Sequence, residues 1–316
     1  MVRKRGDARK RAVLTATKVN AAKLSVGSNS FLVLLKLFAG IITGSVSLIA
    51  EAVHSLMDLA AAVIAFVSVK ISGKPSDEKH PYGHGKAENI SGVAEAVLIF
   101  VAATIIIYEA IQRLITGRTL ELLEIGIGIM AVSIVVNVIV SRYLLKVAHA
   151  TDSLALEADA RHLTTDVMTM VGVLVGLILV RFTGLNWIDP VVAILVALFI
   201  MKTAYELTRK SFGGLIDVKL PEAEESVIRS SIMEHDYQVV AFHALRTRKA
   251  GSHRYIDLHL VMPKNASVEE AHRMCDHLER DIRNRLPKAH VTIHVEPCAT
   301  ECEQCSVSCT IKDRGD

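Results

Sequence analysis

Two histidine–aspartate pairs stand out because each lies inside a long apolar stretch of the chain. His54 precedes Asp58 by four residues, and His162 precedes Asp166 by four. That spacing places both members of a pair on one face of a helix. An ionisable side chain in a membrane-spanning helix costs roughly 2.5–3.5 kcal/mol on insertion, so such residues are expected to have a function. Two facing helices would combine two imidazoles with two carboxylates, a tetrahedral ligand set that suits zinc.

The alternative is that each His–Asp pair only forms a hydrogen bond within a helix bundle. Burying four ionisable groups without a ligand is unfavourable, which favours the metal site. Glu51 and Asp159 come about one turn before the two pairs. They either line the cytoplasmic approach to the site or lie at the membrane boundary.

A second group of metal ligands lies in the polar segment 77–86 between two apolar stretches. Asp77, His80 and His84 could bind a metal ion and leave one coordination position open. Because a loop is flexible, such a site would be weak or transient. The other interpretation is a solvated turn with ordinary surface histidines.

The C-terminal third is rich in histidine, and strand alternation sorts several of these side chains. In 255–262, Ile256, Leu258 and Leu260 share one face and His259 takes the other. In 291–296, His294 and Glu296 lie opposite the apolar residues. These polar side chains can therefore converge on one sheet face, unless they form only an exposed histidine-rich surface. The candidate ligands in this region are His243, His259, His272, His294 and Glu296.

The chain ends in a segment dense in thiols. Its cysteines are Cys298, Cys302, Cys305 and Cys309. Thiolates at this spacing can bind Zn²⁺ or a soft ion such as Cu⁺. A redox-sensitive tail and a disordered tail with idle thiols are the alternatives. The pattern is not the disulfide framework of a secreted domain.

These side chains require long apolar elements to hold them, and the composition provides such elements. The 316 residues are 51% hydrophobic and only 22% charged, with a mean hydropathy of +0.37. Six stretches reach the roughly 20 residues that a membrane-spanning helix needs. They run over residues 22–43, 46–71, 88–115, 122–148, 152–182 and 188–208. Gly44, Gly117 and Gly184 mark short turns between them. The single Trp and low aromatic content argue against a nucleic-acid stacking surface.

Basic residues cluster in the loops of one side, which predicts a cytoplasmic location for both termini. Residues 1–15 form a basic cytoplasmic arm, 16–212 a six-helix transmembrane domain, 213–298 a cytoplasmic α/β domain and 299–316 the Cys-rich tail. Within the α/β domain we expect helices over 221–235 and 268–286, and strands over 239–247, 255–262 and 291–296. Lys86 and Asp217 both fall at the cytoplasmic membrane edge, where they either form an ion pair or are unrelated surface charges.

Three motifs resemble those of the cation diffusion facilitator family, in its bacterial zinc and ferrous-iron efflux branch. They are Gly44–Ser47 leading to His54–Asp58, then Tyr82–Glu88, and His162–Asp166. The resemblance covers about residues 15–298. It implies six helices per protomer, a homodimer, a metallochaperone-like cytoplasmic domain and metal/proton antiport.

The resemblance also assigns roles to the candidate ligands. It implies a transport site at His54, Asp58, His162 and Asp166, a loop site at Asp77, His80 and His84, and cytoplasmic sites at the histidines and Glu296 named above. His54 resembles zinc-preferring members, since many bacterial relatives have Asp there. Glu296 stands where relatives often have Asp. The cysteine tail lies outside the family pattern.

We therefore expect a Zn²⁺/H⁺ antiporter in a prokaryotic inner membrane, with no organic cofactor, no nucleic-acid partner and no enzymatic activity. Zinc would be both the substrate and a regulatory ligand. The same transporter with Fe²⁺, Cd²⁺ or Mn²⁺ as main substrate is an alternative. A membrane-anchored metal sensor would need no ligands inside the bilayer. A metallohydrolase would keep an open zinc position beside a reacting group, whereas four ligands are present here.

Overall fold

The computed structural model describes residues 2–43, 46–116, 124–185, 187–234 and 239–298. The chain forms two compact units, Met1–Gly213 and Gly214–Asp316. Each unit has its own apolar core, so each is described separately.

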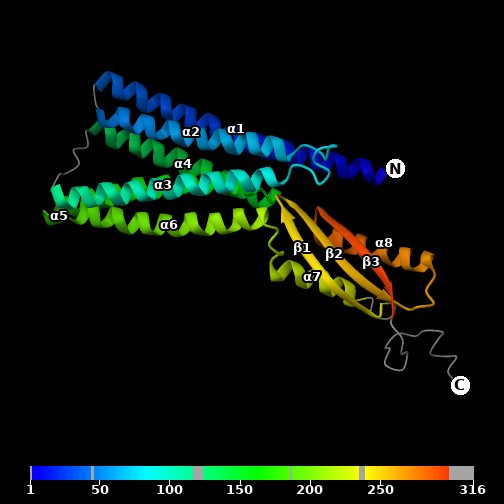
Figure 1. Ribbon diagram of the computed structural model, residues 1–316. Coiled ribbons are helices and arrows are strands. Elements are labelled where there is room, and N and C mark those ends of the chain that lie inside the picture. The colour runs from blue at the N-terminus through cyan, green and yellow to red at the C-terminus, as the bar shows by residue number, and fades with distance from the viewer. Residues whose placement is uncertain (1, 44–45, 117–123, 186, 235–238, 299–316) are drawn as a thin grey trace. The chain divides into compact units, whose positions relative to one another are not determined.

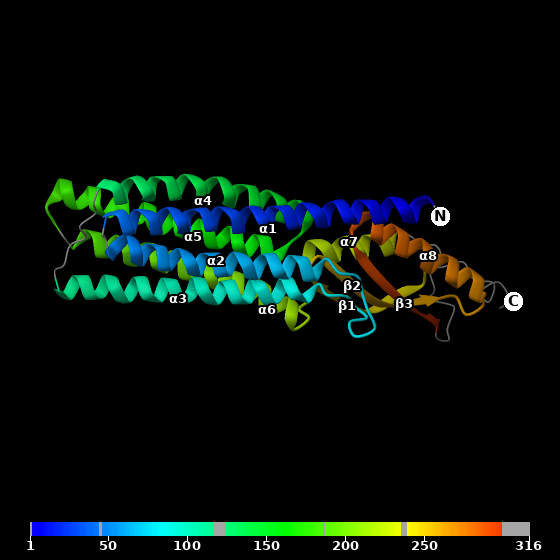
Figure 2. The same ribbon diagram turned by 90° about the horizontal axis from the view of Figure 1, so that it is seen from above.

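The first unit is a bundle of long helices (Figures 1 and 2). In the described residues, six helices are long and apolar enough to cross a membrane, as expected from the hydropathy. They are α1 (Val2–Thr43), α2 (Val46–Ser72), α3 (Lys86–Thr116), α4 (Glu124–Thr151), α5 (Leu154–Thr183) and α6 (Ile188–Leu215).

Helix α1 begins much earlier than its apolar stretch predicts. It has 42 residues and includes the basic N-terminal segment, because Arg, Lys and Ala are good helix formers and extend the helix beyond the apolar core. The expected turn after α5 is present. Gly184 adopts a left-handed conformation with φ 73°, and its N–H bonds the carbonyl oxygen of Val180. The expected turns at Gly44 and Gly117 lie outside the described residues.

The helices pack in a defined pattern. Helix α1 contacts α2 and α4, helix α4 contacts α5, and α2 and α3 both contact α5. Helices α3 and α6 meet at Gly92, where a side chain would collide with Ser211. The Asn89 amide donates a hydrogen bond of 3.1 Å to the backbone oxygen of Ser211. The close approach of α3 and α6 therefore depends on a residue without a Cβ.

A buried carboxylate joins four segments at the loop end of the bundle. Glu88 is 1% exposed, and its Oε1 lies 2.7 Å from Lys18 Nζ of α1. The hydroxyl of Ser72 donates to Oε1 at 2.8 Å, and that of Ser153 donates to Oε2 at 2.7 Å. These residues are termed the Glu88 network below. Every oxygen of this carboxylate has a partner, which is the condition under which a buried charge is tolerated.

The second unit is a small α/β domain. Its elements are α7 (Glu222–Met233), β1 (Ala241–Ala250), β2 (His253–Met262), α8 (Val268–Arg285) and β3 (Ala289–Pro297). The strand order is β1-β2-β3, with β1 antiparallel and β3 parallel to β2. The parallel pair is connected through α8, as a parallel connection requires. All five expected elements are therefore present.

One sheet face forms the core of this domain. Ile256, Leu258 and Leu260 are at most 1% exposed and pack with Leu278 and Ile282 of α8. The predicted alternation along β2 is confirmed, since the polar residues between them lie on the other face. Helix α8 therefore covers the apolar face of the sheet and does not cover the polar face.

Glu225 fixes α7 to the sheet and makes the stability of this domain depend on pH. The Thr247 hydroxyl donates to Glu225 at 2.8 Å and Lys219 lies 3.3 Å away, and both lower the pKa of Glu225 from its ordinary value of 4.5. A lowered pKa stabilises the fold above the unfolded value, and that stabilisation is lost as the pH falls through the folded pKa.

We expect Glu225→Gln to destabilise the domain at pH 7 and the difference from wild type to shrink below about pH 4.5. Hydrogen exchange of the β1 amides, compared between the two proteins at each pH, measures this. A difference that stays constant down to strongly acidic pH would contradict it.

Candidate metal centres

The first candidate centre lies between α2 and α5. His162 Nε2 lies 3.3 Å from Asp58 Oδ1, and His54 Nε2 lies 4.0 Å from the same oxygen. Ligand atoms of His54, Asp58 and Asp166 all lie within 4.8 Å of one another. The structure thus brings together all four side chains singled out from the two i, i+4 pairs, which are termed the intramembrane centre.

One nitrogen atom and one oxygen atom of the intramembrane centre are buried without a hydrogen-bond partner among the described residues. His162 Nδ1 and Asp166 Oδ2 have no hydrogen-bond partner among the described residues. Asp58 and His162 are 7% and 6% exposed, whereas the side chain of His54 is 56% exposed. Buried polar atoms normally have partners, so these atoms indicate a ligand that completes the group.

A cavity of about 500 Å³ connects the intramembrane centre with one end of the bundle. Glu109 and Arg113, near the end of α3, line it together with the four centre residues. On α3 the residues that line the cavity begin at Ile99, so the start of that helix does not line it. The cavity therefore extends from the centre toward the end of the bundle opposite the α2–α3 loop and away from the Glu88 network.

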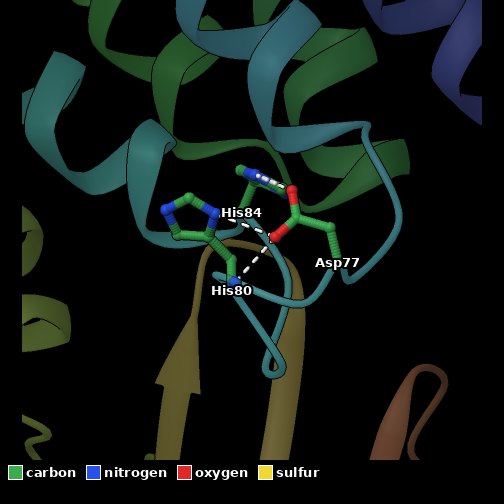
Figure 3. Close-up of side chains that lie close together, drawn as sticks. All are labelled: Asp77, His80 and His84. Atoms are coloured by element: carbon green, nitrogen blue, oxygen red, sulfur yellow. Dashed lines mark hydrogen bonds and ion pairs between the residues drawn. The ribbon is translucent and has the colours of Figure 1, made fainter.

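The second candidate centre lies in the α2–α3 loop. Figure 3 shows the Asp77 carboxylate between two imidazoles, 3.1 Å from His80 Nδ1 and 3.4 Å from His84 Nε2. The backbone N–H of His80 donates to Asp77 at 2.7 Å and lowers the pKa of that carboxyl. The charged carboxylate that a cation needs is therefore favoured. Gly83 closes the turn with φ 82°.

The third candidate centre lies on the polar face of the sheet. His243, His259 and His294 occupy directly opposite positions on the three strands. Glu296 lies 2.7 Å from His259 Nδ1 and 3.2 Å from His243 Nε2. His294 Nε2 is farther from this carboxylate, at 3.8 Å. The ligand atoms of His243, His259 and Glu296 lie within 4.8 Å of one another, so these three form the close group.

Three predicted groupings of residues are not seen assembled in the described part of the chain. His272 does not join the sheet centre within one chain, because α8 covers the opposite face of the sheet and His272 faces Asp276 at 3.8 Å. Cys298 is described and free, but Cys302, Cys305 and Cys309 lie outside the described residues. Asp217 lies 3.4 Å from Arg248, and its pairing with Lys86 would join the two units and stays a prediction.

Two buried acids were missed by the sequence reasoning. Glu88 and Glu95 lie seven residues apart on α3, and both are at most 1% exposed. The rule that singled out the His–Asp pairs, an ionisable residue in an apolar helix, would have found them.

Comparison with known proteins places this architecture in a family. Residues 22–216 match the cation efflux transmembrane domain, and residues 220–298 match the cytoplasmic domain of cation efflux proteins. The two matches define a membrane transporter of cations with a C-terminal cytoplasmic domain of the dimerising type. The chain belongs to the cation diffusion facilitator family and is a cation efflux transporter.

Two relatives that match over most of their length agree with this assignment. The chain is 38% identical to an uncharacterized transporter, sll1263, from Synechocystis sp. over 276 residues, which cover 87% of this chain and 89% of the relative. It is 33% identical to the cation-efflux pump FieF of Salmonella newport, covering 88% and 92% of the two chains. A solved metal-bound C-terminal domain of the CzcD transporter from Thermotoga maritima is 24% identical, covering 26% of this chain and 98% of that one with a TM-score of 0.24.

Proposed function

We propose that this protein exports Zn²⁺ from the cytoplasm in exchange for protons, with the intramembrane centre as its transport site. The observation that carries the proposal is the convergence of two imidazoles and two carboxylates between α2 and α5. Zinc accepts a tetrahedral set of nitrogen and oxygen ligands. The family membership supports a transporter over the alternatives of an anchored sensor or a metallohydrolase.

Competition between metal and protons would couple the two fluxes. Ligation needs neutral imidazoles and ionised carboxylates, so zinc and protons exclude each other from the centre. Zinc would bind while the centre faces the cytoplasm, and protons arriving from the far side would displace it there. The cavity toward Glu109 and Arg113 supports a state in which the centre faces the far side. The protonated centre would then return, and no nucleotide is needed.

We further propose a homodimer in a prokaryotic inner membrane, with both termini in the cytoplasm. The loop centre and the sheet centre would then lie on the side from which zinc is taken. Their ligands are more exposed than Asp58 and His162 of the intramembrane centre, which suits sensing of cytoplasmic zinc rather than transport. Metal binding at the sheet centre would regulate transport through the cytoplasmic domain.

Glu296→Gln is expected to weaken zinc binding at the sheet centre by roughly tenfold or more. The substitution keeps the size of the side chain but removes the charge that lies 2.7 Å from His259 and 3.2 Å from His243. Isothermal titration of the full-length protein with zinc measures the effect as the loss or weakening of one class of sites. Thr292→Ser, a mild change on the same strand, is the control. An unaltered titration of Glu296→Gln would contradict this assignment.

Flux in proteoliposomes tests the transport proposal. Purified protein should accumulate Zn²⁺ on the acidic side of the membrane, because protons leaving that side drive zinc in the opposite direction. Collapsing the pH gradient should stop the accumulation. Competition with Fe²⁺, Cd²⁺ and Mn²⁺, in wild type and in His54→Asp, measures the metal preference, and the Asp variant should lose preference for zinc. Zinc flux that ignores the pH gradient would rule out antiport.

A further inference from the structure

A second group of buried polar side chains lies on the loop side of the intramembrane centre. Glu95 and Ser91 belong to α3, Asp159 to α5 and Ser25 to α1, and all four are at most 1% exposed. None of their six side-chain oxygen atoms has a hydrogen-bond partner of ordinary geometry among the described residues, although the Ser91 hydroxyl lies near Glu95 and the Ser25 hydroxyl near Asp159. Buried polar atoms without partners are rare in native proteins, and six in one place call for an explanation.

These four side chains act on one another. Asp159 and His162 are the charged groups that act electrostatically on Glu95, with the Ser91 hydroxyl beside it. The Ser25 hydroxyl lies beside Asp159. Asp159 precedes His162 by three residues, so the group lies about one helical turn from the transport site. It lies toward the Glu88 network, because Glu95 follows Glu88 by two turns on α3.

The lysines of the surrounding helices are engaged elsewhere, and the imidazole of His162 belongs to the intramembrane centre. Lys18 pairs with Glu88 at 2.7 Å, Lys210 pairs with Glu157 at 2.6 Å, and Lys36 donates to Ser55 at 2.8 Å. Two carboxylates buried together cannot both be ionised without a compensating positive charge. When His162 binds a metal as a neutral imidazole, no ion pair among the described residues supplies a compensating charge to Glu95 and Asp159, so a bound cation or protons must supply it.

We propose that Glu95, Asp159, Ser25 and Ser91 form a second divalent-cation site, through which the metal passes between the cytoplasmic end of the bundle and the transport site. This inference rests on the proposed function for the direction of passage, but not for the site itself. The donor atoms are all oxygens, a set that takes divalent cations without the preference of imidazole for zinc. Zinc would thus bind more weakly here and move on to the histidine-containing centre.

Metal counting tests the site independently of transport. Zinc bound to full-length Asp166→Asn protein, measured by equilibrium dialysis over a concentration series, is compared with zinc bound after adding Glu95→Gln and Asp159→Asn. The loop and sheet centres are the same in both proteins. We expect one zinc ion per protomer fewer in the triple variant. Equal counts would overturn the proposal, even if transport is impaired, because that outcome assigns the pair to protons.

Flux supplies the second measurement. Glu95→Gln with Asp159→Asn should lower zinc flux about tenfold or more, while the exchanged pair Glu95→Asp with Asp159→Glu keeps both carboxylates and should keep the bound ion. Glu206→Gln, an exposed acid on α6 that faces Lys202, is the control and should transport like wild type. If the neutral variant fails to fold, the exchanged pair decides the question. A bound ion kept by the exchanged pair supports the site, and a bound ion lost from the folded exchanged pair counts against it. If wild type transports no zinc, but the triple variant still binds one zinc ion fewer than the Asp166→Asn protein, the transport proposal fails and the site stands.

Discussion

Asp166→Asn is expected to lower zinc flux by roughly 100-fold or more while leaving the protein folded. Replacing a residue that only supports a metal ligand commonly costs 10–100-fold, and a direct ligand should cost at least as much. The asparagine keeps the shape of the side chain, so the helices α2 and α5 should pack as before. The substitution changes the charge, because it removes one of the two carboxylates of the intramembrane centre, those of Asp58 and Asp166.

The measurement is zinc flux in proteoliposomes at equal protein density, with size-exclusion elution as the check on folding. Glu206→Gln removes a carboxylate from a spanning helix without touching the centre and should leave the flux unchanged. A folded Asp166→Asn protein that transports within a fewfold of wild type would remove this side chain from the transport site.

Glu88→Ala is expected to be the most destabilising single change in the bundle. It would leave the ammonium of Lys18 buried without its partner at 2.7 Å, and breaking a buried pair on one side costs about 3–5 kcal/mol. The hydroxyls of Ser72 and Ser153 would also lose their acceptor. Thermal unfolding in detergent should therefore show a large drop in the midpoint.

Removing both charges should be milder than removing one. Lys18→Met with Glu88→Leu replaces the pair by apolar groups of similar size, so stability should recover substantially. Lys219→Ala, which breaks ion pairs with Glu222 and Glu225 in the second unit, should leave the bundle unaffected. A double variant as unstable as Glu88→Ala would show that the network does not act through charge pairing.

The i, i+4 spacing predicted that each His–Asp pair shares one helix face, whereas the packing of α2 against α5, which brings the two pairs together, required the structure. Period-two alternation similarly predicted that His259, His294 and Glu296 share a face of the sheet. Neither pattern gives the order of the strands, so the position of His243 directly opposite His259 required the structure.

Contacts between distant segments were not predictable in the same way. Lys18 and Glu88 are 70 residues apart, and nothing local in either segment indicates the other. The position of His272 depended on which sheet face α8 covers, and the helix periodicity alone leaves that open. Glu95 differs, since an acid in an apolar helix is visible in the sequence, but its neighbours Asp159 and Ser25 are set by packing.

The missing side chain at Gly92 has a mechanical consequence. Helices α3 and α6 touch at Ser211 and are also held by the Asn89 amide, so sliding one past the other would break a fitted contact. Helix α5 is also tied to α6, by the Lys210–Glu157 pair at 2.6 Å and by the fit of Gly172 against Val196. Among the described residues, α2, which carries His54 and Asp58, shows no comparable contact with α6. Alternating exposure of the intramembrane centre would then involve a tilt of α2 against α3, α5 and α6, which these contacts hold together.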